Sequence, residues 1–206
     1  MRLKYIITFV SLLSAVSFAQ EFISDFTWNF GFPQSQMKEY VSKTSYKGFA
    51  IEGRRFLNKN LSAGLFFGWN IFDERVDKPI EINGENYGGT VSGTQLRYVN
   101  SFPMMANMHY YFGKRKDIRF YLGANAGLYY ILQRLDLGVW RLESDNWHFG
   151  LAPEAGVLIP LDSQSHIIVN IKYNYAFDSG TGLGKVDDNY YSYWGLNFGF
   201  AFSSMF

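Results

Sequence analysis

Hydrophobic and polar positions alternate with period two along most of the chain. Near its end, Trp194, Leu196, Phe198, Phe200 and Phe202 share one parity, and the residues between them are small or polar. Successive side chains of a β-strand point to opposite faces, so this pattern predicts a strand with one bulky apolar face. The same alternation predicts eight strands in all, at residues 22–32, 47–57, 61–71, 96–112, 118–132, 147–161, 166–178 and 190–202.

The connections between these strands alternate in length. Short polar turns are expected at Asn58–Asn60, Gly113–Asp117 and Asp162–Ser165, and longer loops at 33–45, 73–94, 134–146 and 178–189. An antiparallel meander places the short turns at one end and the long loops at the other. Short periplasmic turns and longer extracellular loops are typical of bacterial outer-membrane barrels, whose tilted strands need about 9–11 residues to cross the bilayer.

The chemistry of the two faces decides which solvent surrounds the sheet. One face carries large apolar side chains, and the other carries Gly, Ala, Asn and Ser with few charges, which is too sparse for a water-exposed exterior. A soluble lipocalin-like barrel would reverse this arrangement. Lipid favours bulky apolar residues outside, a narrow lumen needs small ones inside, and closure leaves no unpaired edge. We therefore predict an all-β fold, a closed antiparallel eight-stranded transmembrane β-barrel with up-and-down topology.

Aromatic residues gather near the predicted strand ends, where interfacial girdles lie in such barrels. The outer group is Trp69, Trp147, Tyr190 and Trp194, and the inner group is Phe22, Tyr110, Phe112, Phe120 and Phe206.

Composition and the first segment narrow the class of protein. The 206 residues include 20 Phe and 15 Tyr but no Cys, which excludes disulfide scaffolds and thiolate metal sites. A net charge of +1 gives no basic field for nucleic acid. Residues 1–19 combine Arg2 and Lys4, an apolar run and the small residues Ser17 and Ala19, which predicts a signal peptide. The expected organisation is a signal peptide at 1–19 and a barrel domain at 20–206.

At its end the chain resembles a known family. With Phe206 last, and Asn197, Gly199 and Phe202 spaced before it, the sequence resembles the small eight-stranded outer-membrane barrels of the OmpA/OmpX type. These four residues look like the sorting signal that the barrel-assembly machinery reads, although Ser204 stands where that pattern prefers an apolar residue. The resemblance implies the cell outer membrane of a Gram-negative bacterium, with outer-membrane lipids and lipopolysaccharide as surroundings.

Charged residues on the inward parity predict a filled lumen. They are Asp25, Glu52, Arg54, Arg119, Glu154 and Lys172. If Ile159 faces Ile167 across the Asp162–Ser165 turn, antiparallel register brings Glu154 opposite Lys172. Buried charges persist when they are paired, so we predict an interior salt-bridge network that plugs the barrel. A narrow path for ions or small solutes through the same groups is the alternative.

Some residues break the pattern inside predicted strands. Pro103 and Pro153 cannot donate to a strand ladder, so we expect bulges there. Arg55 falls on the lipid face near a periplasmic turn, where it could snorkel to headgroups, unless a bulge at Gly53 changes the register.

The sequence offers little for catalysis. All three histidines, His109, His148 and His166, face inward by parity, the first and last near the periplasmic end. His148 follows Ser144 and Asp145 at the outer rim, where lipid-modifying barrel enzymes hold their catalytic groups. Triads are identified by geometry rather than by neighbourhood in sequence, so we predict no catalytic residue, metal or cofactor and keep a lipid-modifying enzyme as an alternative.

The outer loops are the remaining candidates for function. Residues 131–142 alternate around a turn, and Asn83-Gly84 is a hairpin signal, so two strand pairs are expected to project beyond the membrane. Exposed strands at 73–94 and 134–146 could contact a protein partner or pack on each other. The acidic loop 178–189 suggests cation bridging to lipopolysaccharide. The expected role is structural or interactive, in adhesion or as a complex-associated component.

Overall fold

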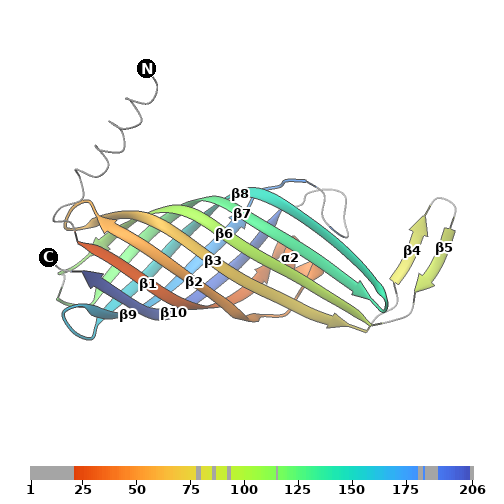
Figure 1. The fold of residues 1–206 in the computed structure, drawn as a ribbon, viewed down its shortest axis with the longest axis horizontal. Coiled ribbons are helices and arrows are strands. Elements are labelled where there is room, and N and C mark those ends of the chain that lie inside the picture. The colour runs from red at the N-terminus through yellow and green to blue at the C-terminus, as the bar shows by residue number, and fades with distance from the viewer. Residues whose placement is uncertain are drawn as a thin grey trace, which may run out of the picture.

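The computed structural model confirms a closed barrel. It describes residues 21–77, 80–84, 87–91, 94–114, 116–180, 183 and 190–204, and the predicted signal peptide therefore lies outside the described residues. Eight antiparallel strands form one sheet, in which neighbours along the chain lie side by side and the last strand pairs with the first (Figure 1). No helix among the described residues has the length and apolar character needed to cross a bilayer.

All eight barrel strands agree with the predicted ones, although at the long-loop end six extend further than predicted and the last two stop one or two residues short. They are β1 (Phe22–Gln34), β2 (Ser45–Phe56), β3 (Leu61–Val76), β6 (Gln95–Phe112), β7 (Arg119–Leu137), β8 (Trp140–Pro160), β9 (Ser165–Ala176) and β10 (Tyr191–Ser204). A short helix, α2 (Ser35–Tyr40), lies within the first long loop, where we predicted none.

Both projecting strand pairs are present. β7 and β8 pair without interruption up to Leu137 and Trp140, so this hairpin is a direct extension of the barrel wall. β4 (Ile80–Gly84) and β5 (Tyr87–Val91) form a separate two-stranded sheet. Asn83 and Gly84 belong to a strand there and pair with Gly88 and Tyr87, so the turn prediction was wrong by two residues, because a dipeptide signal alone does not fix register.

The structure corrects the bulges that we expected at the prolines. Pairing on both sides of Pro103 keeps one register, and so does pairing around Pro153, although each proline and the residue before it are unpaired on that side. At the first site the neighbouring strand carries Gly68, which leaves room for the Pro103 ring, because a Cβ at residue 68 would lie 3.1 Å from Pro103 Cγ. The strands therefore stay in register and lose only local hydrogen bonds.

The structure also decides between an outward-facing Arg55 and a bulge at Gly53, the two alternatives that the sequence left open for β2. It continues unchanged through Gly53, and the irregularity lies further along, where β1 residues Asn29 and Gly31 face Gly48 and Ser45. Arg55 consequently keeps the outward parity of Phe49 and Ile51, close to the short turns.

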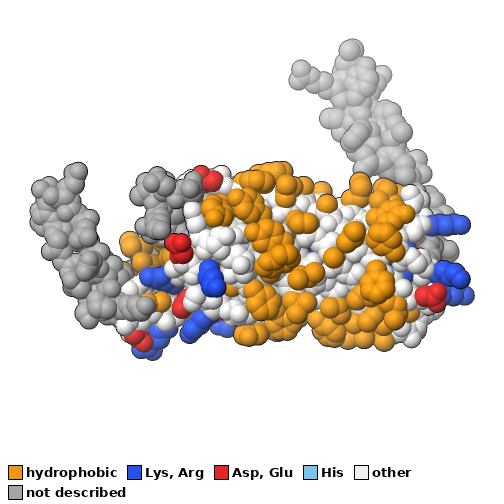
Figure 2. Space-filling model, turned by 180° about the vertical axis from the view of Figure 1, so that it is seen from behind, with side chains coloured by type: hydrophobic (Ala, Val, Ile, Leu, Met, Phe, Trp, Pro, Cys, Tyr) orange, Lys and Arg blue, Asp and Glu red, His pale blue; other side chains and the backbone are white. Residues whose placement is uncertain are grey.

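The outward face forms an apolar belt. Phe26, Phe67, Phe120, Phe149 and Phe198 are each about half exposed, whereas residues of the other parity are buried in the lumen. Figure 2 shows apolar side chains over the middle of the barrel and charged ones at both ends. Such a surface matches the hydrocarbon of a bilayer between two interfacial regions. Both described chain ends and the short turns lie at one end, which we call the periplasmic end (Figure 1).

Candidate functional site

The lumen is layered along the barrel axis. The extracellular half is filled by an apolar cluster that includes Phe72, Val99 and Tyr129. Met37 of α2 and Val41, which follows the helix, also belong to this cluster. The periplasmic half holds a second apolar cluster, which includes Ile23, Phe56, Tyr111 and Leu158. Polar and charged side chains occupy the space between them. This charged layer is thus enclosed by apolar packing on both sides.

Helix α2 closes the extracellular mouth of the barrel. Contacts with the barrel strands hold the helix in place. Met37 and Val41 are 2% and 0% exposed. Arg97 Nη1 donates to the carbonyl of Tyr40 at 3.1 Å, and the Tyr40 hydroxyl donates to the carbonyl of Arg134 at 3.0 Å. Burial raises the pKa of Tyr40 to about 12. The loop that we expected to be irregular is therefore a packed lid.

Five of the six predicted interior charges come together in the charged layer. Arg54 Nη2 on β2 forms a short ion pair with the Asp25 carboxylate on β1, and its Nε lies 3.3 Å from Glu52 Oε1. Glu154 and Lys172 are directly paired across β8 and β9, with Nζ 3.0 Å from Oε2. All five side chains are at most 3% exposed.

Arg119 lies apart from this layer. It sits at the periplasmic end, where Nη2 donates to the carbonyl of Lys59 at 3.0 Å. Its guanidinium packs over the ring of Tyr111, 4.5 Å from the centroid. Arg119 has the inward parity that we predicted, but the register of β7 places it next to the short turn, below the other five charges.

His109 lies at the centre of the charged layer, a position that we did not predict. Its ring lies between two carboxylates, with Nδ1 3.7 Å from Glu52 Oε1 and Nε2 3.4 Å from Glu154 Oε2, and it is fully buried. Gly123 makes this placement possible, because a Cβ there would lie 2.2 Å from His109 Cδ2. A large inward residue opposite a glycine on the adjacent strand was the available signal.

Neutral side chains complete the network. The Tyr121 hydroxyl donates to Glu154 Oε1 at 2.8 Å, and Asn107 Nδ2 donates to Glu52 Oε1 at 2.7 Å. Asn197 donates to Asn170, which in turn donates to the Tyr121 hydroxyl at 3.1 Å. Hydrogen bonds of this kind satisfy carboxylate oxygens that would otherwise be costly to bury.

Three of these side chains have the composition of a metal site. Glu52, His109 and Glu154 bring one ligand atom each to within 4.8 Å of one another. The same carboxylate oxygens already contact Arg54 and Lys172, so a metal ion would have to displace a resident cation. The two ring nitrogens of His109 also face different carboxylates, and one ion cannot bind both. The geometry therefore fits an ion-pair network better than a metal centre.

His148 does not form a triad with its sequence neighbours. Its Nδ1 lies 2.8 Å from the carbonyl oxygen of Phe177, and its ring packs edge-on against Tyr191. Asp145 is on the outward parity and accepts a hydrogen bond from the Tyr130 hydroxyl at 3.1 Å. Ser144 is four residues from His148 along an extended strand, which is roughly 13 Å. These groups do not converge on one point.

The residues of the predicted sorting signal have structural environments of their own. Asn197 belongs to the luminal network, and Phe202 is 54% exposed in the belt. Gly199 lies where β1 and β10 approach closely, since a Cβ there would be 2.0 Å from the carbonyl oxygen of Phe26. Phe206 lies outside the described residues.

Comparison with known proteins finds similar solved structures but no match to a protein family. No family model matches the chain, and no curated protein matches it. The outer membrane protein OprG from Pseudomonas aeruginosa is 13% identical, covers 91% of this chain and 97% of its own, and superposes with a TM-score of 0.52.

Two further solved structures superpose with lower scores. Ail, the attachment invasion locus protein of Yersinia pestis, solved with a heparin analogue, is 11% identical over 90% of this chain and 99% of its own, with a TM-score of 0.49. Neisserial surface protein A is 16% identical over 91% and 97%, with a TM-score of 0.47. Together with the closed meander and its apolar belt, the comparison with OprG shows that the chain has the fold of the small eight-stranded outer-membrane β-barrels.

Proposed function

We propose that this outer-membrane β-barrel protein is a non-enzymatic structural and interaction component with a plugged lumen. The observation that carries the proposal is the layered interior, in which the charged layer is closed on both sides by apolar side chains. Ions would have to displace packed side chains as well as break buried ion pairs. Conduction through the barrel is therefore disfavoured, and function is left to the parts outside the membrane.

The extracellular end of the β7–β8 hairpin is the best candidate for contact with a partner. Val139, Trp140 and Leu142 are 95%, 75% and 50% exposed, well away from the belt. Asp136 accepts from Arg141 Nε at 2.9 Å and lies 3.4 Å from Arg134, so ion pairs along the hairpin hold its shape. Exposed apolar side chains on a preformed element favour protein binding, because little conformational entropy is lost.

The loops at 73–94 and 134–146 are the proposed partner region, and lipopolysaccharide is the proposed neighbour of the acidic loop 178–189. Asp178 is the described acidic residue of that loop. The separation of His148 from Ser144 and Asp145 supports a role without catalysis.

Planar-bilayer conductance tests the plug. The purified barrel should give no steady open level, while a porin reconstituted in the same bilayer conducts. A stable open level of the native protein would favour the alternative, a narrow channel for small solutes. A change in lipid composition that depends on His148 would instead favour the lipid-modifying enzyme.

Site-specific photo-crosslinking tests the hairpin. A photoreactive residue at Val139 should capture a protein in native membranes, and the same group at Phe149, in the lipid belt, serves as the matched control. Trp140→Ser should abolish the capture and change the free energy of unfolding by less than about 0.5 kcal/mol, as surface substitutions usually do. Equal capture from both positions would contradict the proposed role.

A further inference from the structure

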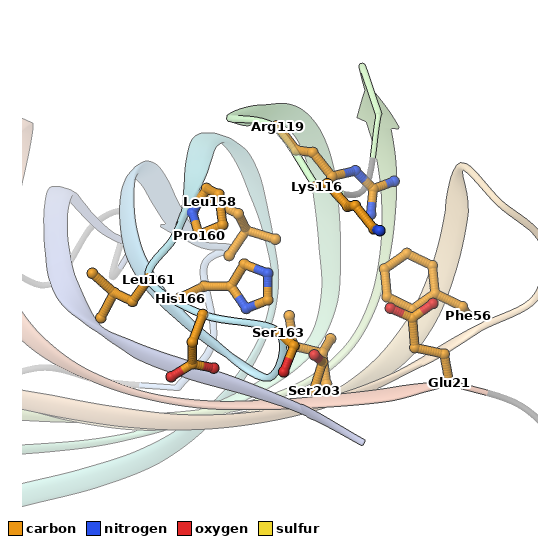
Figure 3. Close-up of a pocket in the computed structure, with 12 residues that line it drawn as sticks. Glu21, Phe56, Lys116, Arg119, Leu158, Pro160, Leu161, Ser163, His166 and Ser203 are labelled. Carbon is orange, nitrogen blue, oxygen red and sulfur yellow. The ribbon is translucent and has the colours of Figure 1, made fainter. Parts of the chain in front are cut away.

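A cavity of about 490 Å³ opens at the periplasmic end of the barrel. This volume lies within the roughly 300–1,000 Å³ of typical small-molecule pockets. Figure 3 shows its lining, which comes from Glu21 before β1, from the periplasmic ends of the strands and from the β6–β7 and β8–β9 turns. The polar and charged side chains of this lining belong neither to the charged layer nor to the extracellular hairpin.

One side of this periplasmic pocket is cationic. Arg119 is 4% exposed, and its guanidinium is fixed between the Tyr111 ring, at 4.5 Å, and the Phe56 ring, at 5.4 Å. Its bond to the carbonyl of Lys59 further limits its movement. Lys116, from the adjacent turn, also lines the cavity. A held guanidinium beside an ammonium group suits a carboxylate, because guanidinium donors match carboxylate geometry.

Acidic and apolar groups complete the lining. Glu21 and Asp162 supply two carboxylates, which balance the two permanent cations in formal charge. Asp162 is held in the β8–β9 turn, where it accepts from the backbone N–H groups of Gln164 and Ser165 at 2.7 and 2.8 Å. Phe56 and Leu158 provide an apolar floor. A purely anionic ligand would meet these carboxylates, so a ligand with charges of both signs fits better.

The pocket is blind on its inner side. Phe56 and Leu158 also belong to the periplasmic apolar cluster, in which Ile23, Tyr121 and Ile168 are buried at 2% or less. A molecule entering from the periplasm therefore meets packed side chains before it reaches the charged layer. The cavity has the shape of a binding site rather than of a channel entrance.

We propose that the periplasmic pocket binds a small zwitterion of the amino-acid or short-peptide class. The ligand carboxylate lies against Arg119 and Lys116. Its ammonium group faces Glu21 and Asp162, and its side chain rests on Phe56 and Leu158. Binding on this side is independent of the extracellular role proposed above.

The dipeptide Ala-Leu is a suitable probe, and the barrel in lipid nanodiscs is the sample. NMR titration should show saturable shifts at Lys116 and His166, with a dissociation constant at or below about 1 mM. Ala-Leu amide, which lacks the carboxylate, and N-acetyl-Ala-Leu, which lacks the ammonium group, should each bind at least tenfold more weakly. Absence of shifts, or equal binding of the capped peptides, would overturn the proposal.

Two substitutions in one exposed turn give a matched pair. Lys116→Gln removes a cation that lines the pocket, whereas Lys114→Gln removes one that does not. Both side chains are exposed, so neither change threatens folding. Lys116→Gln should weaken Ala-Leu severalfold without changing the binding of the amide, and Lys114→Gln should leave both unchanged. Equal effects of the two substitutions would show that surface charge alone attracts the peptide and would refute a pocket.

Discussion

Removing the ammonium group of Lys172 tests whether the charged layer is a coupled network. Nζ lies 3.0 Å from Glu154 Oε2 and 3.4 Å from the centroid of the Phe66 ring, and both side chains of the ion pair are almost fully buried. Breaking a buried ion pair typically costs about 3–5 kcal/mol, because one charge is left uncompensated. In Lys172→Met, Glu154 keeps its hydrogen bonds from Tyr121 and Asn125. We therefore expect the lower end of that range, about 3 kcal/mol.

A second substitution should recover much of this loss. Glu154→Gln in the Lys172→Met background removes the uncompensated charge and keeps a side chain of the same shape. The double variant should lie within about 1.5 kcal/mol of the native protein, and the coupling between the two positions should exceed about 1 kcal/mol. Urea unfolding in lipid vesicles, followed by tryptophan fluorescence, measures each free energy of unfolding.

Lys47 supplies the control, because it forms an ion pair with a similar N–O distance on the solvent-exposed surface. Its Nζ lies 2.7 Å from Asp73 Oδ1, but the lysine side chain is 62% exposed. Exposed pairs contribute about 0–1 kcal/mol, so Lys47→Met should have little effect. If Lys172→Met costs no more than Lys47→Met, or if the two luminal substitutions simply add, the charged layer is not the coupled network described above.

Three further outcomes follow from local geometry. Gly199→Ala should destabilise the refolded barrel by about 1–3 kcal/mol in urea unfolding, because the new Cβ would meet the backbone of Phe26. Gly195→Ala should be tolerated, because no atom lies nearer than 3.4 Å to the position of its Cβ. Equal effects of the two substitutions would refute the steric argument. Backbone hydrogen bonds lower the pKa of Asp162, so the stabilising effect of this carboxylate is complete above its unfolded pKa of 3.8 and is lost on acidification. In Asp162→Ala, the free energy of unfolding should therefore depend less on pH in the acid range. An unchanged pH dependence would contradict this. The raised pKa of Tyr40 predicts the opposite sign, with stability lost as pH rises from 10 towards 12. The tyrosinate absorbance of the native protein should include a late titration step that Tyr40→Phe lacks, and identical absorbance curves would contradict this.

The sequence predicted the barrel well because lipid and lumen impose opposite chemistry on alternate residues. That constraint acts on each strand separately, so parity alone placed Phe198 outward and Lys172 inward. A short turn adds register, and from the Asp162–Ser165 turn the pairing of Glu154 with Lys172 follows by counting. These features depend on local sequence only.

The remaining features depend on contacts between distant segments. The place of His109 depends on its pairing with Gly123 and on the pairing of Gly123 with Glu154, across two successive strand pairs. Helix α2 has six residues and gains its order from burial of Met37, which its own sequence does not reveal. Pro103 escapes a bulge because Gly68 lies on the adjacent strand.

The seam between β1 and β10 has a consequence for incomplete copies of the protein. Asp25, on the first strand, is the carboxylate partner of Arg54, and Asn197, on the last, reaches the luminal network through Asn170. A polypeptide that lacked either strand would present an open strand edge to hydrocarbon, and the Arg54 guanidinium or the Asn170 amide would lose one of its partners. Truncated products should therefore fail to insert stably in the bilayer, so that only a polypeptide made to its full length yields a finished cylinder.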